Sequence, residues 1–304
     1  MSRATKLIAG MMFAVSKLGG AYLTREARER TVRAFARIMD ELGFTHLISV
    51  ADIRGKHLRQ YIARRRTEVK GVRTLHNEMS HLRRVLRIGG QSVVANAQEL
   101  SNKALGLVGA SRRGTKVPLT DENYARVRLR ALDSGRPGMA AMIRLQRAFG
   151  LRANEAIHAR SDTLDRWRSE LHEGNISVIA GTKGGRPRNV PILSIDEALA
   201  AIDEAREITA RQGSFLIVSA NGKPSGGLKQ ARSIFHGWCN RAAIQPHAAR
   251  YAFAQEFLTQ LIEKGYSERE AYVAVALALG HGDGRGRYIR LVYGRRPVKV
   301  KGDK

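Results

Sequence analysis

"HAARYAFAQEFL", residues 247–258, places a histidine three positions before an arginine at the start of an amphipathic helix pattern. Because side chains three positions apart share one face of a helix, His247 and Arg250 can point at the same ligand. A guanidinium fork binds phosphate oxygens, and an imidazole beside it can donate or accept a proton. A capping histidine with a solvated arginine is the plainer interpretation, and this stretch alone does not separate the two.

The charge of the chain indicates a polyanionic partner. The 304 residues include 53 Lys and Arg against 27 Asp and Glu, a formal net charge of +26. That surplus is too large for an enzyme of a small anionic metabolite. The basic residues are spread along the chain and no apolar run of about 18 residues occurs, which favours nucleic acid over a membrane as the partner.

The cysteine content and the first residues bear on the compartment. Cys239 is the only cysteine, so neither an intramolecular disulfide nor a cysteine-rich zinc site can form within the chain. The stretch 1–23 is faintly similar to a signal peptide, but Lys17 interrupts its apolar run. We therefore expect a cytoplasmic protein.

The hydrophobic pattern predicts two domains of a mainly α fold. Basic amphipathic helices indicate a helical N-terminal domain over 1–110, a Gly-, Ser- and Pro-containing stretch predicts a linker over 111–120, and the second domain covers 121–304. Alternation around a Lys-Gly-Gly-Arg turn predicts a β-hairpin within 175–193. The other predicted elements are helices over 24–43 (Thr24 as N-cap, Gly43 as stop), 52–66, 72–88, 121–133 and 137–149, with four further helical segments after the hairpin and a short helix at "RYIRLVYG".

Three further motifs place basic or aromatic residues in a specific context. "FGLRANEAI", 149–157, presents Arg152 with Glu155 as its ion-pair or capping partner. "GTKGGRPRNVPI" carries Lys183 at the hairpin turn, and "LALGHGDGRGRYIRLVYGRR", 277–296, presents His281 after a helix end and two tyrosines after a glycine-rich turn. Each motif alone is also consistent with surface or core residues.

In this order, the motifs resemble the catalytic domain of the tyrosine recombinases, the phage-integrase family, over about 118–296. The resemblance implies a helical core-binding domain followed by a catalytic domain that needs no metal or other cofactor. It implies that five residues surround one scissile phosphate of double-stranded DNA, and that a tyrosine attacks it to give a 3′-phosphotyrosyl link and a free 5′-hydroxyl. Those five residues are Arg152, Lys183, His247, Arg250 and His281.

The identity of the nucleophile is open because the spacing departs from the family pattern. The family places its tyrosine about nine residues after the second histidine, whereas Tyr288 follows His281 by seven and Tyr293 by twelve. We favour Tyr293, because the inserted glycines indicate a longer loop that leaves the tyrosine near the end of a short helix. Tyr288 is the alternative, and five positions on a helix turn the two side chains about 140° apart.

The resemblance further implies a homotetramer acting on two DNA duplexes, in the integration, excision or resolution of a mobile element. A protein that keeps the fold and binds DNA without cutting it is the competing hypothesis, since the tyrosine spacing is irregular. A metal-dependent nuclease would need clustered carboxylates, and a nucleotide-driven enzyme a glycine-rich phosphate loop; neither pattern occurs in the sequence. The side chains of Tyr251 and Trp238 are expected to fill the core.

Overall fold

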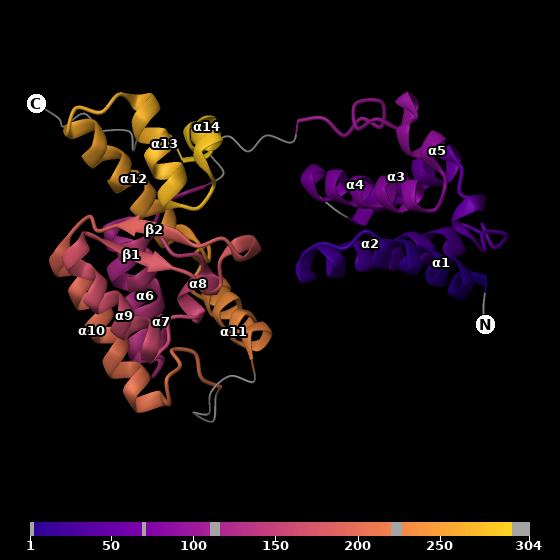
Figure 1. Ribbon diagram of the computed structural model, residues 1–304. Helices are drawn as coiled ribbons and strands as arrows, with labels where there is room; N and C mark the ends of the chain where they lie inside the picture. The colour runs from indigo at the N-terminus through magenta and orange to yellow at the C-terminus, as the bar shows by residue number, and fades with distance from the viewer. Residues whose placement is uncertain (1–2, 69–70, 110–115, 220–226, 294–304) are drawn as a thin grey trace, which may run out of the picture. The chain divides into compact units, whose positions relative to one another are not determined.

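The chain forms two compact units that divide between Ser111 and Arg112. The computed structural model describes residues 3–68, 71–109, 116–219 and 227–293, and Figure 1 traces both units. Part of the predicted linker, 111–115, and the basic tail after Tyr293 lie outside the described residues.

The first unit is helical, as the sequence predicts. Its α-helices lie in two layers, with α3 and α4 over α1 and α2 (Figure 1). They are α1 (Arg3–Lys17), α2 (Tyr22–Glu41), α3 (Gly55–Glu68), α4 (Val72–Ile88) and α5 (Ser92–Asn96), with the 3₁₀ helices η1 (Val50–Asp52) and η2 (Gln98–Leu100). The faint signal-like stretch forms α1, which contributes Leu7, Met11 and Val15 to the core of this unit.

The apolar stripes of these helices form that core, and the start of α2 differs from the sequence prediction. Apolar residues of α3 and α4, such as Tyr61 and Leu82, are buried. Leu42 is exposed because it is the C-cap of α2, where the helical periodicity has already ended. Thr24 is not the N-cap: α2 begins at Tyr22 after Ala21, and the Thr24 amide donates to the carbonyl of Ala21 (2.9 Å).

The second unit combines helices with one two-stranded antiparallel sheet. Its α-helices are α6 (Asp121–Asp133), α7 (Pro137–Phe149), α8 (Ala153–Ile157), α9 (Ser161–Glu170), α10 (Ile195–Gln212), α11 (Leu228–Arg241), α12 (Ala248–Glu263), α13 (Glu268–Ala278) and α14 (Gly286–Tyr293). Its strands are β1 (Asn175–Val178) and β2 (Arg188–Pro191), and its 3₁₀ helices are η3 (Leu171–Glu173), η4 (Lys183–Gly185) and η5 (Asp283–Arg285). The predicted hairpin within 175–193 is confirmed, and so are the helices over 121–133 and 137–149.

The hairpin connects the two helical groups of this unit. β1 packs against α9 and β2 against α13, and Figure 1 shows the hairpin between α6–α10 and α12–α14. In the register, Val178 pairs with Arg188 and Ile176 with Val190. The residues of β2 alternate between buried and exposed, so that Arg188 points to the same buried side as Val190.

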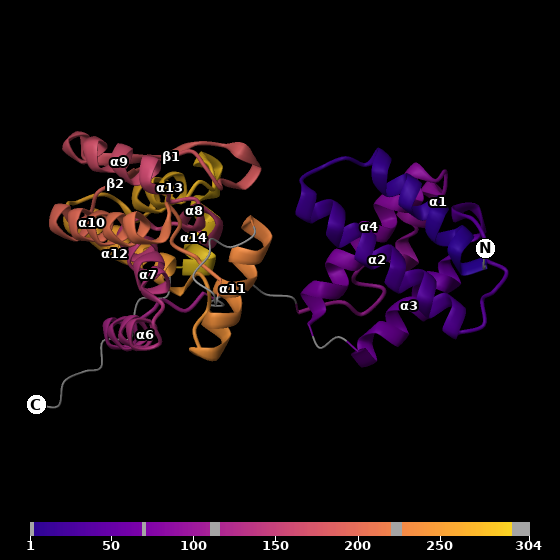
Figure 2. The ribbon, with the colours of Figure 1, turned by 90° about the horizontal axis from the view of Figure 1, so that it is seen from below.

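Helix α12 carries the opening histidine–arginine motif, and its residues 248–254 are buried. It packs against α7, α13 and α14, while α11 lies beside α8 (Figure 2). Elsewhere in this unit, Gly138 at the start of α7 packs against the segment after α10, and a Cβ on Gly138 would lie 1.6 Å from the carbonyl oxygen of Leu216. Trp238 and Tyr251 are buried, as predicted. Within the described ranges, no helix is both long and apolar enough to cross a membrane.

Candidate active site

Arg152 lies at the start of α8, directly after the turn that ends α7. Its Nη1 donates to Oε1 of Glu155 (2.6 Å), and its backbone N–H donates to Oε2 of the same carboxylate (2.6 Å). Nη2 donates to the carbonyl of Leu279 (2.7 Å). The predicted partnership of Arg152 with Glu155 is confirmed, and Arg152 is joined to the end of α13, 127 residues further along the chain.

Arg250 comes from α12 and is 2% exposed. Its Nη2 donates to the carbonyl of Leu279 (2.6 Å), the same oxygen that Arg152 binds, and its Nη1 donates to the carbonyl of Gly150. Gly150 has the left-handed φ of 57°, and a Cβ there would lie 2.5 Å from the ring of Phe253. The glycine of "GLRANE" thus allows its carbonyl to meet Arg250.

Arg188 on β2 is a member of this cluster that the sequence analysis missed. Its guanidinium binds both oxygens of Glu155, and its Nε donates to the carbonyl of Ala278 (2.7 Å). The alternation of β2 was the available signal: an arginine on the same face as Val190 must be buried and therefore needs a carboxylate.

Glu155 is the counter-charge of the three arginines. Burial alone would raise the pKa of Glu155, but the guanidiniums of Arg188, Arg250 and Arg152 outweigh it and hold that pKa below its ordinary value of 4.5. Burial and the other arginines lower the pKa of Arg250 to about 10, which leaves it charged at neutral pH. Three guanidiniums share one carboxylate here, so the cluster has an excess of positive charge.

His247 is the N-cap residue of α12, but its side chain makes no capping hydrogen bond. Its Nδ1 is buried without a hydrogen-bond partner among the described residues. Burial, and next the charge of Arg250, lower the pKa of His247 to about 4, so that its ring is neutral at neutral pH. A neutral imidazole with an unused buried nitrogen can exchange a proton with a group that enters the site.

His281 follows α13 through Gly280, whose φ is 63°. A Cβ at Gly280 would lie 2.9 Å from Cδ of Arg188 and 3.5 Å from Nη1 of Arg152. The Nε2 atom of His281 is buried, and no described residue hydrogen-bonds to it. Burial, followed by the charges of Arg250 and Arg152, lowers the pKa of His281 to about 3.

The two candidate tyrosines on α14 differ in their surroundings. The ring centroid of Tyr293 lies 6.4 Å from that of His281 and 5.3 Å from that of Tyr251, edge to face. Burial raises the pKa of Tyr293, while the charge of Arg250 and a hydrogen bond with it act in the opposite direction. Tyr288 is half-buried, with its centroid 5.2 Å from that of His281. Both tyrosines therefore flank His281, and Tyr293 is the one beside Arg250.

Two lysines border the site. Lys183 is exposed on η4, and its charge contributes to the low pKa of His281. Lys116, which the sequence analysis did not select, places its Nζ 5.1 Å from the centroid of the Tyr251 ring. Nothing in the local sequence distinguishes Lys116 from the other basic residues of the predicted linker.

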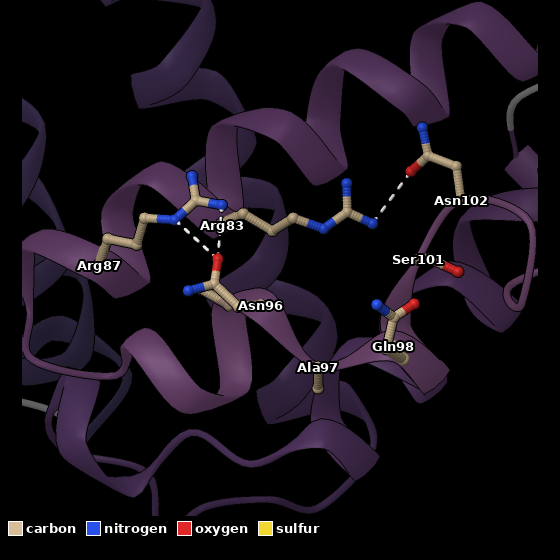
Figure 3. A pocket seen from close by; sticks show the side chains of 8 residues that line it. Arg83, Arg87, Asn96, Ala97, Gln98, Ser101 and Asn102 are labelled. Carbon is tan, nitrogen blue, oxygen red and sulfur yellow. Dashed lines mark hydrogen bonds between the residues drawn. The ribbon is translucent and has the colours of Figure 1, made fainter.

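A separate hollow of about 400 Å³ lies on the first unit, between α4 and the segment after α5 (Figure 3). Arg87 donates from Nε (3.1 Å) and Nη2 (2.8 Å) to Oδ1 of Asn96, and Arg83 donates to Oδ1 of Asn102 (3.0 Å). The two bonds from Arg87 use both lone pairs of the Asn96 oxygen, and Asn102 already accepts one bond from Arg83, so N–H donors outnumber free acceptor positions among these four side chains. Such a lining suits an anion.

The second unit thus contains a site with the chemistry of phosphoryl transfer. Arg250 and the ring of His281 lie beside the buried Tyr293, and the charge of Arg250 also acts on the neutral His247. A tyrosine hydroxyl is a nucleophile once it loses its proton. Across the described parts of the chain, no group of three or more His, Cys, Asp or Glu is arranged to hold a metal ion. The second unit thus combines a mainly α fold and a small hairpin with this cluster, and the class of such a fold is defined by its known relatives.

Comparison with known families identifies that class. A family described as "Integrase" matches residues 106–256, and one described as "Phage integrase, N-terminal" matches residues 4–95. The chain belongs to the phage-integrase family, the tyrosine recombinases, whose members carry out site-specific recombination. No curated relative matches the chain.

Solved structures share the fold. A lambda integrase tetramer bound to a Holliday junction is 18% identical with a TM-score of 0.60, and the match covers 96% of this chain and 78% of that chain. The Tn1549 transposon integrase in complex with transposon right end DNA is 17% identical with a TM-score of 0.61, covering 95% of this chain and 96% of that chain. The predicted fold class, a helical domain followed by a tyrosine-recombinase catalytic domain, is confirmed.

Proposed function

We propose that the chain cuts and rejoins duplex DNA at specific sites through a covalent 3′-phosphotyrosyl intermediate, in the integration, excision or resolution of a mobile element. The observation that carries the proposal is the position of Tyr293. The buried ring of Tyr293 lies beside Arg250 and His281. Arg250 and Arg152 both donate to the carbonyl of Leu279, so the two arginines lie together.

In the proposed reaction, the Tyr293 oxygen attacks the scissile phosphorus as the bond from phosphorus to the 5′-oxygen breaks. His247 is neutral and accepts the tyrosine proton. Lys183, on the exposed turn, donates a proton to the departing 5′-oxygen. Rejoining reverses these steps with the 5′-hydroxyl of the other strand, so the ester bond conserves the energy of the broken phosphodiester and no nucleotide cofactor is required.

The arginines act on the phosphate oxygens. Negative charge builds on the non-bridging oxygens in the transition state, and donors that are already in place stabilise it without reorganisation. Arg152 and Arg250 are held in place by the carbonyl of Leu279 and by Glu155. His281 can donate from its unused Nε2 in the tautomer that carries the proton there.

We propose double-stranded DNA as the partner, held by both units. The net charge of +26 supports this, as does the donor-lined hollow of Arg83 and Arg87 on the first unit. The structures with the same fold include an integrase tetramer on a Holliday junction, which supports a homotetramer on two duplexes for this chain. The expected cytoplasmic location remains part of the proposal.

The deciding experiment traps the covalent intermediate. The full chain is incubated with a nicked duplex that carries the joined ends of the encoding element, and a denaturing gel resolves protein–DNA adducts. We expect an adduct with the wild type and with Tyr288→Phe, and none with Tyr293→Phe. Loss with Tyr288→Phe alone would keep the class of enzyme and transfer the nucleophile to Tyr288.

The competing hypothesis, a DNA-binding protein that does not cut, predicts no adduct from the wild type on a duplex that it binds. Arg152→Ala supplies the matched control for binding. It should abolish the adduct and leave duplex binding nearly unchanged, because many other cations contact the DNA backbone. An equal loss of binding and cleavage would mean that Arg152 only contacts DNA.

A further inference from the structure

A row of ring contacts connects Lys116 to the proposed nucleophile. Nζ of Lys116 lies 5.1 Å from the centroid of the Tyr251 ring, within the range of a cation–π interaction. The Tyr251 ring meets the Tyr293 ring edge to face at 5.3 Å. Tyr251 and Tyr293 are 4% and 5% exposed, so neighbouring side chains restrict both rings.

The backbone around Lys116 is attached to the second unit at the same place. The N–H of Leu119 donates to the carbonyl of Ala248 (3.0 Å), the residue after His247, and the Leu119 side chain is buried in the core of this unit. Pro118 limits the backbone between the two positions. Lys116 therefore reaches Tyr251 from a fixed point beside the start of α12.

We propose that Lys116 is a positioning residue for cleavage: by holding the Tyr251 ring, it keeps the Tyr293 ring in place beside Arg250. This inference rests on the proposed function, with Tyr293 as the nucleophile. Lys116 acts through Tyr251 and is not assigned a contact with the phosphate.

The charge of Lys116 also acts on His247, which gives the proposal a second observable. The pKa of His247 is lowered by burial, then by Arg250 of the same helix, Lys116, His236 of α11 and Arg152 at the start of α8. Removing the Lys116 charge therefore raises the pKa of His247. Because the proposed reaction needs neutral His247, the acidic limb of the plot of cleavage rate against pH must then move to higher pH.

The test measures adduct formation in single-turnover reactions on the nicked duplex, with the chain in saturating excess over DNA. Lys116→Met keeps the apolar stem and removes the charge, while Lys116→Arg keeps a cation that stacks on tyrosine. The matched control is Lys264→Met, which removes one charge at the opposite end of α12, about 24 Å away along the helix.

We expect Lys116→Met to slow adduct formation about three- to thirty-fold, the factor that corresponds to one cation–π contact. The acidic limb of its pH–rate profile should move up by roughly half a pH unit, which is the effect of removing one nearby charge that water partly screens. Lys116→Arg should restore both the rate and the pH profile, and Lys264→Met should cleave at the wild-type rate.

A double-mutant cycle with Tyr251→Leu tests the route of the effect. If Lys116 acts through the Tyr251 ring, Lys116→Met should slow the Tyr251→Leu chain far less than it slows the wild type. A wild-type rate and profile for Lys116→Met, or full additivity with Tyr251→Leu, would overturn the proposal. Failure of the proposed function would be recognised separately, since the wild type itself would then form no adduct.

Discussion

Glu155→Gln removes the one carboxylate that faces three arginines and leaves the size of the side chain unchanged. Arg152 is partly exposed and can regain water, but the side chains of Arg188 and Arg250 are only 5% and 3% exposed. Leaving a buried charge without its partner costs about 3–5 kcal/mol. We expect the free energy of unfolding of the second unit to fall by about that amount.

The assay is thermal and denaturant unfolding of the full chain, with the transition of the second unit followed separately. For a unit of this size, such a loss lowers the midpoint temperature by roughly 6–20 °C. Glu207→Gln is the control, because its pair with Arg211 is exposed and should contribute about 0–1 kcal/mol. Equal, small effects of the two substitutions would refute the view that Glu155 compensates the buried guanidiniums.

Three further predictions concern packing, protonation and DNA contact. Gly138→Ala should lower the free energy of unfolding by about 1–3 kcal/mol, since its Cβ would collide with the Leu216 carbonyl; unfolding at the wild-type midpoint would contradict the close packing there. Burial lowers the pKa of His57 from 6.5 to about 4, so between these pH values the unfolded chain binds a proton that the folded chain does not. The free energy of unfolding should therefore decline as the pH falls from 6.5 to about 4. The decline should be shallower in His57→Asn, and an unchanged decline would exclude His57 as its source. Replacing Arg83 and Arg87 by Gln should weaken duplex binding and reduce the slope of log affinity against log salt by about 2; an unchanged slope would exclude backbone phosphate contacts in that hollow.

The helices and the hairpin could be predicted from the sequence because both depend on local residue patterns. Periodicity placed α4 at its observed bounds, and the glycine turn placed the hairpin. The i,i+3 spacing brought Arg152 to Glu155, and the segment after His281 formed the expected short helix ending at Tyr293.

What could not be predicted depends on contacts between distant parts of the chain. Arg188 meets Ala278 across 90 residues, and Lys116 meets Tyr251 because a linker residue folds back onto α12. No local pattern encodes either contact. In the sequence, the preference for Tyr293 over Tyr288 rests on the inserted glycines, whereas burial beside Arg250 is what distinguishes the two tyrosines in the structure.

The shared carboxylate of Glu155 has a consequence for how the family can diverge at this site. Loss of Arg188 alone removes the strongest partner of Glu155, and loss of Glu155 alone leaves Arg188 buried without a counter-charge. Each single change is costly, and a joint replacement by apolar residues of similar volume still leaves Arg250 buried without a carboxylate. Homologous chains should therefore change positions 155 and 188 only where a neighbouring residue supplies another carboxylate for Arg250.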